Sequence, residues 1–292
     1  MVKITKEIQA MLALLEDPDP EVHRQVMQGF VDRGPEMLPV LKEAGRRYTF
    51  GVMAERMEWM ADEIRFNILY AQLEDWKTYR THDLGFVIRS VEAFQYPDAS
   101  SERMEQWIAR VRKEIWLGMS EELSAIERIR VLNHVLYAMY HLRGTAQDEE
   151  SRLSHFFLSR ALDSGKASPV LLVLLYLFLA QSMELPVLPV PLPKHFVLAY
   201  MESQGAKDIR GQSLAGKEKF FINPYSRGAV FSRREIEHFL IQSGHEGPLP
   251  QPEPCSFPVF IAGWLSAIRD WHEKAGHTRR ANYYSRFIQL LS

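Results

Sequence analysis

Few residues of this chain combine the chemistry of a nucleophile with a setting that could activate it. The one cysteine, Cys255, lies in a proline-rich connector, PEPCSFP. A cysteine becomes reactive beside a base or at a helix N-terminus, and nothing near Cys255 in the sequence supplies either. Ser168 precedes Pro169 at the start of an apolar stretch, which is typical of a helix cap and a first helical position. We therefore expect the Ser168 hydroxyl to cap a helix, with nucleophilic chemistry as the alternative.

Two segments of the sequence contain histidines that could take part in catalysis or metal binding. His195 begins HFVLAY, an apolar run that predicts a strand, and Asn223 opens the turn NPYSRG after another such run. His195 is expected either to be buried and hydrogen-bonded to Asn223 or to belong to a ligand-binding site. The segment from His272 to His277, HEKAGH, resembles the zinc motif HExxH but is one residue too long, and Gly276 should end the helix between the histidines. We therefore expect two unrelated histidines and no metal site.

These residues need a scaffold, and the longest apolar stretch of the chain predicts its centre. Residues 168–180 read SPVLLVLLYLFLA and contain eleven consecutive apolar residues from Val170 onwards. This run is too short for a membrane span, which needs about 20 residues, and it fits a core helix. A helix that is apolar on every side must be covered on every side. The rest of the domain should therefore pack around it.

Helical periodicity dominates the first half of the chain. Apolar residues recur at helical spacing within 4–15, and Asp19 followed by Pro20 predicts the cap and the first position of the next helix. Short amphipathic helices joined by a DPDP turn resemble HEAT repeats, of which we count about one and a half units. Further helices are predicted at 52–79, 84–94, 101–117, 123–140 (preceded by Ser120) and 148–162.

After Leu185 the pattern changes to short apolar runs bounded by Gly, Pro and Asn, which predict antiparallel strands. The runs lie at 196–200, 220–222 and 229–231. Ser232 and Glu235 then form the capping-box pattern of a short helix. Helices at 260–274 and 277–291 close the chain and predict a helical hairpin.

The expected fold class is α+β and predominantly helical, with a small antiparallel sheet. We divide the chain into a helical N-terminal region at 1–115, a core at 116–245, and a linker with the C-terminal hairpin at 246–292.

Composition narrows the class of protein. The 292 residues are 46% hydrophobic and 25% charged, with a net charge of −2, as in ordinary globular proteins. Nucleic-acid binders usually carry a strongly basic domain or stripe, and none is present. No signal-peptide pattern opens the chain and no apolar run reaches membrane-spanning length. We therefore expect a cytoplasmic protein that binds neither nucleic acid nor membrane, and a single cysteine excludes a framework of intrachain disulfides.

The order of elements resembles a known group of proteins. A long buried helix followed by HFVLAY and FFINPYSRG is similar to the transglutaminase-like branch of the papain-like thiol hydrolases. More narrowly, the chain resembles the SirB1 family of bacterial transglutaminase-like proteins. The residues that carry this resemblance are RVLN at 130–133, the stretch at 168–186, LPKHFVLAY and the closing helical pair. The resemblance extends over about residues 129–292.

The resemblance implies the positions of a degenerate catalytic triad. The superfamily uses a thiolate at the N-terminus of the buried helix, a histidine base and a carboxylate that orients the histidine. By resemblance these positions fall on Pro169, His195 and Asn223. Proline carries no nucleophile, and a proline at this site is usual in the SirB1 family. Asparagine is neutral but can accept a hydrogen bond from an imidazole, and Lys194 departs from the family's usual glycine.

The resemblance therefore implies a transglutaminase-like core without its nucleophile, a pseudoenzyme that binds a protein or peptide. Two alternatives stay open. One is a residual hydrolase that uses His195 with water or with Ser168, and the other is a small-ligand binder that keeps the cleft around His195. No cofactor is implied.

Overall fold

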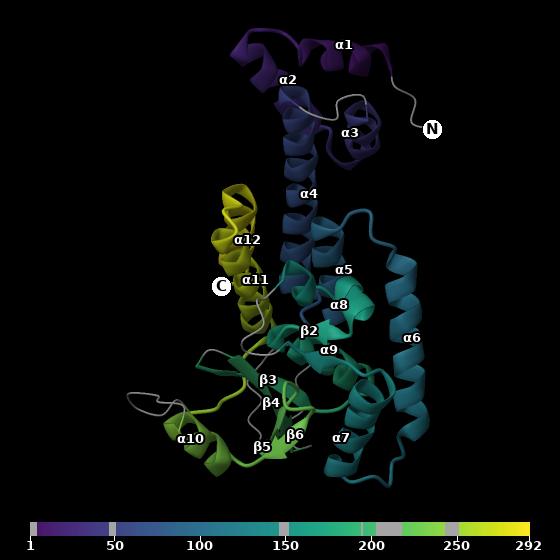
Figure 1. The fold of residues 1–292 in the computed structure, drawn as a ribbon, viewed down its shortest axis with the longest axis vertical. Helices are drawn as coiled ribbons and strands as arrows, with labels where there is room; N and C mark the ends of the chain where they lie inside the picture. Colours follow the sequence, from purple (N-terminus) through teal and green to yellow (C-terminus); the bar gives the residue numbers. More distant parts are fainter. Residues whose placement is uncertain (1–4, 47–50, 146–151, 194, 203–217, 243–250) are drawn as a thin grey trace. The chain divides into compact units, whose positions relative to one another are not determined.

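The computed structural model describes residues 5–46, 51–145, 152–193, 195–202, 218–242 and 251–292 (Figure 1). The chain forms two compact units, Met1–Gln72 and Leu73–Ser292, and the boundary between them falls within one long helix, α4 (Val52–Tyr79).

The first unit consists of short helices around a small apolar core. Its elements are α1 (Lys6–Leu14), α2 (Pro20–Asp32), the 3₁₀ turn η1 (Gly34–Met37), α3 (Leu38–Gly45) and the start of α4. The predicted cap is confirmed, because the Asp19 side chain accepts a hydrogen bond from the Glu21 amide at 2.8 Å and Pro20 is the first helical residue. Apolar residues of all four helices, including Phe30 and Met60, form one buried cluster.

The second unit contains the remaining helices. Its elements up to the buried helix are α5 (Leu84–Gln95), α6 (Ser101–Gly118), α7 (Ala125–Asn133), the π-helical turn η2 (His134–Met139), η3 (Leu153–Phe156), α8 (Leu158–Ser164) and α9 (Pro169–Ser182). After the sheet follow α10 (Arg233–Gln242), α11 (Phe257–Lys274) and α12 (Thr278–Leu291).

Two predicted helices differ from the structure. The cap of α7 is Ser124, which forms a capping box with Glu127, and Ser120 lies outside the helix. The helix predicted at 148–162 is two shorter elements in the described part, because Phe157 has extended backbone between η3 and α8.

A four-stranded antiparallel sheet has the order β3-β4-β5-β6, formed by Val187–Leu192, His195–Met201, Glu218–Asn223 and Ala229–Phe231. The last three strands confirm the prediction, whereas the sequence analysis missed β3. Its sequence, VLPVPL, contains two prolines, which cannot donate ladder hydrogen bonds. They are accepted because β3 lies at the edge of the sheet. A short parallel pair, β1 (Arg143–Gly144) with β2 (Lys166–Ala167), was also not predicted.

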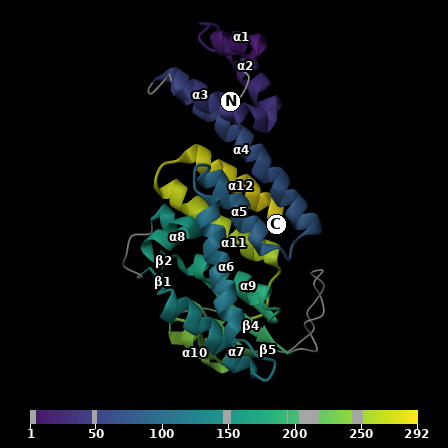
Figure 2. The ribbon, with the colours of Figure 1, turned by 90° about the vertical axis from the view of Figure 1, so that its right-hand side faces the viewer.

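The predicted core helix is α9. Its apolar residues from Leu171 to Leu177 are all buried, together with Leu179 and Ala180. Helices α7 and α11, the turn η3 and strands β3 and β4 all contact it, which places α9 between the sheet and the surrounding helices. The two orthogonal views in Figures 1 and 2 show α9 among the helices above the sheet.

One polar contact links α9 to the turn that follows β5. The Tyr176 hydroxyl donates to Asn133 Oδ1 at 2.9 Å, and Asn133 Nδ2 donates to the Gly228 carbonyl at 2.9 Å. Burial raises the pKa of Tyr176 well above its usual value, so the phenol stays protonated and acts as a donor. Gly228 has φ of 72°, and a Cβ atom there would overlap the Asn133 side chain. Position 228 therefore requires glycine, because its φ is positive and because no room is left for a Cβ atom.

Two more hydrogen bonds hold the same turn. The buried Tyr137 hydroxyl donates to the Pro224 carbonyl at 2.8 Å, and the Tyr225 hydroxyl donates to the Thr145 carbonyl at 2.9 Å. The turn at 223–228 is thus fixed from α7, η2, α9 and the segment after β1.

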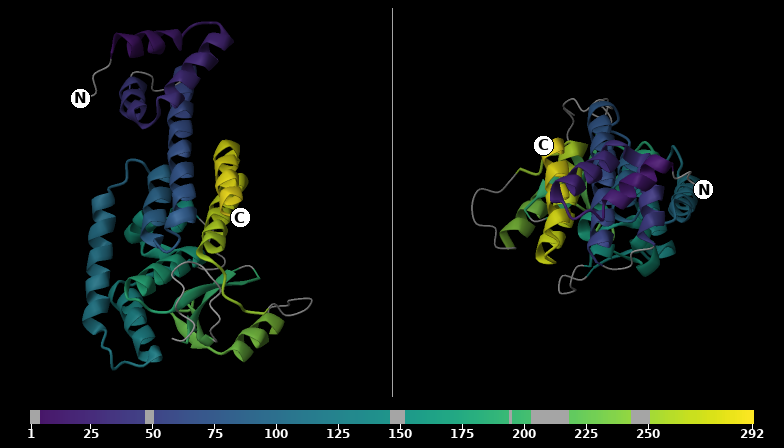
Figure 3. Two further views of the ribbon diagram at one scale, coloured as in Figure 1. Left: turned by 180° about the vertical axis from the view of Figure 1, so that it is seen from behind. Right: turned by 90° about the horizontal axis from the view of Figure 1, so that it is seen from above.

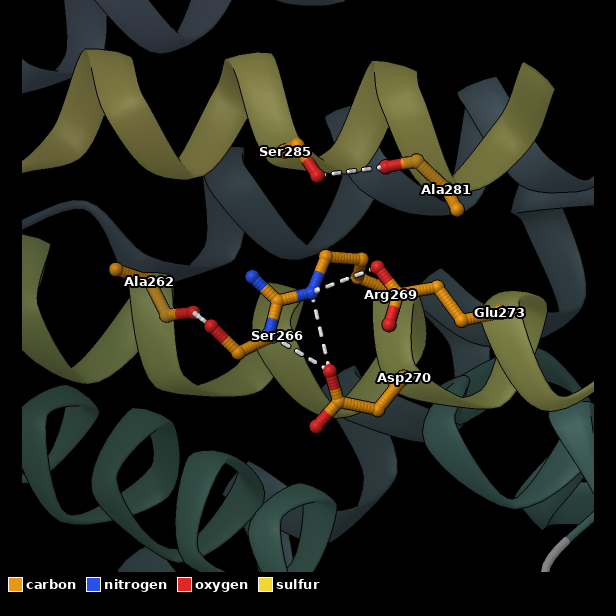
Figure 4. Close-up of polar contacts among 7 residues, drawn as sticks. All are labelled: Ala262, Ser266, Arg269, Asp270, Glu273, Ala281 and Ser285. Atoms are coloured by element: carbon orange, nitrogen blue, oxygen red, sulfur yellow. Dashed lines mark hydrogen bonds and ion pairs between the residues drawn. The ribbon is translucent and has the colours of Figure 1, made fainter. Parts of the chain in front are cut away.

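The C-terminal hairpin is confirmed, with Gly276 at φ of 74° between α11 and α12. Figure 4 shows polar contacts on the two helices, where Ser266 Oγ donates to the Ala262 carbonyl at 2.8 Å and Arg269 pairs with Asp270 at 2.7 Å. Such contacts lie within one helix. The packing between α11 and α12 comes from buried side chains, among them Ile268 and Phe287.

His272 lies buried in this hairpin, contrary to the expectation that it is unrelated to His277. The turn at Gly276 brings the two Nδ1 atoms to 3.3 Å, and the His272 ring stacks on Tyr284 with centroids 5.5 Å apart. Burial, followed by the positive charges of His277 and Arg280, lowers the pKa of His272 to about 4.

We expect Gly228→Ala to destabilise the protein more than Gly276→Ala. Both glycines have positive φ, and either alanine costs about 1–2 kcal/mol of backbone strain. Only the Gly228 variant meets a neighbour, Asn133, which adds about 2 kcal/mol, the usual cost of overpacking. Urea unfolding followed by circular dichroism measures the difference, and equal losses would contradict the role given to the turn.

Stability should fall as the pH drops from about 6.5 to about 4. Unfolded His272 binds a proton with a pKa near 6.5 and the folded residue with a pKa of about 4, so acid favours the unfolded state. The full shift corresponds to about 3 kcal/mol. Unfolding curves across this range should show a shallower pH dependence for His272→Gln, whereas the exposed control His82→Gln should keep the wild-type slope.

Candidate functional site

The N-terminus of α9 is the position at which the superfamily's nucleophile is expected. Ser168 is 2% exposed, and its Oγ accepts a hydrogen bond from the Leu171 amide at 3.3 Å, which confirms the predicted cap. Its own amide donates to the His155 carbonyl at 2.7 Å. Pro169 follows as the first helical residue, and its ring is exposed. The exposed residue at the helix start thus has no group that could attack a substrate.

His195 is the first residue of β4 and pairs with Leu192, the last residue of β3. Its Nδ1 lies 3.1 Å from the Pro193 carbonyl. Because a carbonyl can only accept, Nδ1 carries the proton of the neutral ring and Nε2 has the acceptor lone pair. Burial lowers the pKa of His195, against the weaker opposing effect of the Pro193 hydrogen bond. The half-buried imidazole is therefore neutral at pH 7.

Asn223 is the last residue of β5, and its side chain is engaged within its own turn. Its Oδ1 accepts from the Tyr225 amide at 3.0 Å and from the Ser226 amide at 3.3 Å, while Nδ2 donates to Ser226 Oγ at 3.1 Å. A carbonyl oxygen has two lone pairs, so the two amides occupy Oδ1. Asn223 acts here as a turn residue, and its oxygen is not available to orient an imidazole.

The strand register places His195 and Asn223 at the same end of the sheet. Leu198 pairs with Ile222 in the antiparallel β4–β5 ladder, so Asn223 lies opposite Val197, two residues from His195. Residues two apart on a strand share a face, which makes His195 and Asn223 diagonal neighbours. Val197 belongs to the apolar cluster that includes Ile236 and Leu240 of α10. The pleat therefore assigns both residues to the face of the sheet that α10 covers.

Helix α11 packs against the start of β4 and against the turn η3, which supports the start of α9. The Phe196 ring meets Phe260 edge-on, with centroids 5.0 Å apart. One turn later, Trp264 Nε1 donates to the Phe156 carbonyl at 3.0 Å, and Phe156 follows the residue that accepts from Ser168. Strand β4 and the turn η3, whose His155 carbonyl accepts from Ser168, thus pack against successive turns of α11.

A second histidine near α9 was missed by the sequence analysis. His155 is 4% exposed, its carbonyl accepts from Ser168, and its Nδ1 accepts from the Arg152 amide at 3.3 Å. It lies in the 3₁₀ turn η3, whose short sequence has no periodic pattern that would predict a buried histidine. The His155 carbonyl thus supports the backbone just before α9, and the imidazole holds the start of its own turn.

Cys255 lies away from any base among its described contacts. Its amide donates to the Pro189 carbonyl at 2.8 Å, on the outer edge of β3. Burial raises the pKa of its thiol to about 12. Since the thiolate is the attacking form, Cys255 is a poor nucleophile at neutral pH.

Neither a metal site nor a membrane span is found in the part of the chain that the structure describes. Among these residues, no three His, Cys, Asp or Glu side chains gather in a group that could hold a metal ion. His272 and His277 are adjacent, but they are two donors beside the cationic Arg280. No described helix has both the length and the apolar character needed to cross a bilayer.

Comparison with known proteins shows to which family the chain is related. The family model of the transglutaminase-like superfamily matches residues 98–254, more than half of the chain. F-box only protein 21 from Mus musculus and from Homo sapiens are each 28% identical over 111 residues. That match covers 38% of this chain and 17% of each relative, so the chain spans a small part of their length. No solved structure matches. The family match, together with a buried helix followed by strands that begin at His195 and end at Asn223, shows that this chain belongs to the transglutaminase-like superfamily.

Proposed function

We propose that this protein is a non-catalytic, SirB1-type member of its superfamily, cytoplasmic, that binds a protein or peptide. The observation that carries the proposal is the start of α9, where Pro169 is exposed and the neighbouring Ser168 hydroxyl is buried as a helix cap. A helix N-terminus activates a thiol by its dipole, but a proline ring offers nothing to activate. The framework keeps the helix without its attacking group.

Two further residues support this proposal. The oxygen of Asn223 is occupied by the amides of its own turn. The Cys255 thiol has a pKa of about 12 and lies beside β3. A transglutaminase-type reaction requires a thiolate, a base and an orienting group to act together, and the described contacts supply only the imidazole.

The small share of each relative that matches this chain supports a binding role. The match occupies 17% of the length of F-box only protein 21, so the related segment there is one part of a longer protein. A segment of this kind, combined with other regions, is suited to act as an interaction module. At native expression, affinity purification of the tagged protein should recover a specific partner, and finding none would count against a binding role.

One observation favours a residual hydrolase as the second candidate. His195 is neutral at pH 7 and half-exposed, so its Nε2 could serve as a base toward water.

We expect the wild-type protein to show no hydrolysis above buffer on a panel of peptide amides and p-nitrophenyl esters. Without an activated nucleophile, the remaining imidazole provides only weak base catalysis. The His195→Ala variant should give the same rates as the wild type. A wild-type rate that His195→Ala abolishes, and that His82→Ala at an exposed position leaves unchanged, would establish the hydrolase instead.

Cys255 should react slowly with iodoacetamide in the folded protein. At pH 8 a thiol with a pKa of about 12 is thiolate to about 1 part in 10⁴, so we expect alkylation at least roughly a hundredfold slower than in 8 M urea. Mass spectrometry follows this reaction at the single cysteine. Fast labelling of the folded protein would show that Cys255 is activated and would reopen a thiol mechanism.

A further inference from the structure

Helix α6 has one buried and one exposed face. Met104, Ile108, Val111 and Ile115 are buried and lie at helical spacing. The exposed face carries Ala109, Arg112, Lys113 and Trp116, and Figure 3 shows α6 at the periphery of its unit.

The exposed face of α6 forms one wall of a shallow cavity that is open to solvent. The cavity has a volume of about 330 Å³ and is lined by Ala109, Arg112, Lys113 and Trp116, with Met183 at the end of α9 as the fifth residue. The side chain of Trp116 is 68% exposed, and the adjoining Leu117 is 60% exposed. A large aromatic residue left in water at the rim of a cavity is typical of an interaction site.

Arg112 and Lys113 differ from Arg103 and Arg89, two other cations near α6 that have carboxylate partners. Arg103 pairs with Asp163, and Arg89 lies 3.6 Å from Glu105. Arg112 and Lys113 are both exposed, and no carboxylate of the described residues forms an ion pair with either. Their charges are therefore available to an external anion. The guanidinium group binds a carboxylate through two parallel hydrogen bonds.

We propose that this cavity binds an acidic peptide segment of a partner protein, with a carboxylate on Arg112 and Lys113 and a neighbouring apolar side chain on Trp116 and Met183. The inference rests on the proposed binding function and adds to it the location of the binding site and the chemical class of the ligand. The combination of two cations with an indole, a thioether and a methyl group matches a short acidic and apolar motif.

A protein partner fits these observations better than a nucleic acid or a membrane. The chain has a net charge of −2, and the cavity carries two cations where nucleic-acid surfaces present a basic stripe. Two cations are also fewer than the clusters of four to eight with which proteins bind anionic lipid surfaces.

The test is selection of random 12-residue peptides by phage display on the full-length protein, followed by fluorescence polarisation with the enriched peptides. We expect sequences with Asp or Glu beside an aromatic or aliphatic residue. Trp116→Ala should weaken their binding about tenfold or more, as loss of a central aromatic contact does. The double variant Arg112→Glu/Lys113→Glu should weaken it further, and the wild-type affinity should fall with rising salt.

Arg110→Glu is the matched control, because Arg110 is exposed on the same helix and lies outside the cavity. It should leave the affinity unchanged, and urea midpoints should show that all variants are folded. Enriched peptides that bind every variant equally would place the peptide site elsewhere and overturn this inference, while leaving the proposed binding function intact. Failure to enrich any peptide would overturn both, and enriched peptides without acidic residues would overturn the assigned chemistry.

Discussion

Helix α9 has no polar face, and this constraint organises the second unit. Nine of its residues between Leu171 and Ala180 are buried, so helices or strands must cover every side of it. The buried Tyr176 hydroxyl then needs an acceptor, because an unpaired polar group in a core is costly. It finds that acceptor in Asn133, which in turn binds the Gly228 carbonyl. A requirement for satisfied hydrogen bonds inside the core thus fixes a turn at the end of the sheet.

The same turn occupies one residue of the expected triad. Three anchoring contacts hold residues 223–228, and within the turn the Asn223 oxygen stabilises the chain reversal by accepting two amides. Near this turn, the hydroxyl of Ser168 closes the first turn of α9. The Ser168 hydroxyl and the Asn223 side-chain oxygen therefore both form structural hydrogen bonds. His195 alone keeps an imidazole that is partly open to solvent and neutral.

A framework with proline at the start of α9 can still present binding surfaces. The buried side of α6 holds it on the unit, which leaves the opposite side to carry Arg112, Lys113 and Trp116. Because these side chains lie outside the core, they can change without loss of the fold. Binding through such a surface would be independent of the degenerate site at α9, so the family framework and the binding chemistry can be tested separately.

The sequence by itself determined most helices, because caps and apolar periodicity act over a few neighbouring residues. Asp19, Ser168 and Gly276 all have the local roles predicted for them. The absence of a nucleophile at Pro169 follows from residue type alone. Only the tertiary structure decided which distant groups meet. The prolines of β3 are tolerated because that strand lies at an edge, and His272 meets His277 because a turn folds back. Asn223 is occupied because its own turn supplies two amides. Local patterns specify elements, whereas partners across the fold depend on packing that no short stretch encodes.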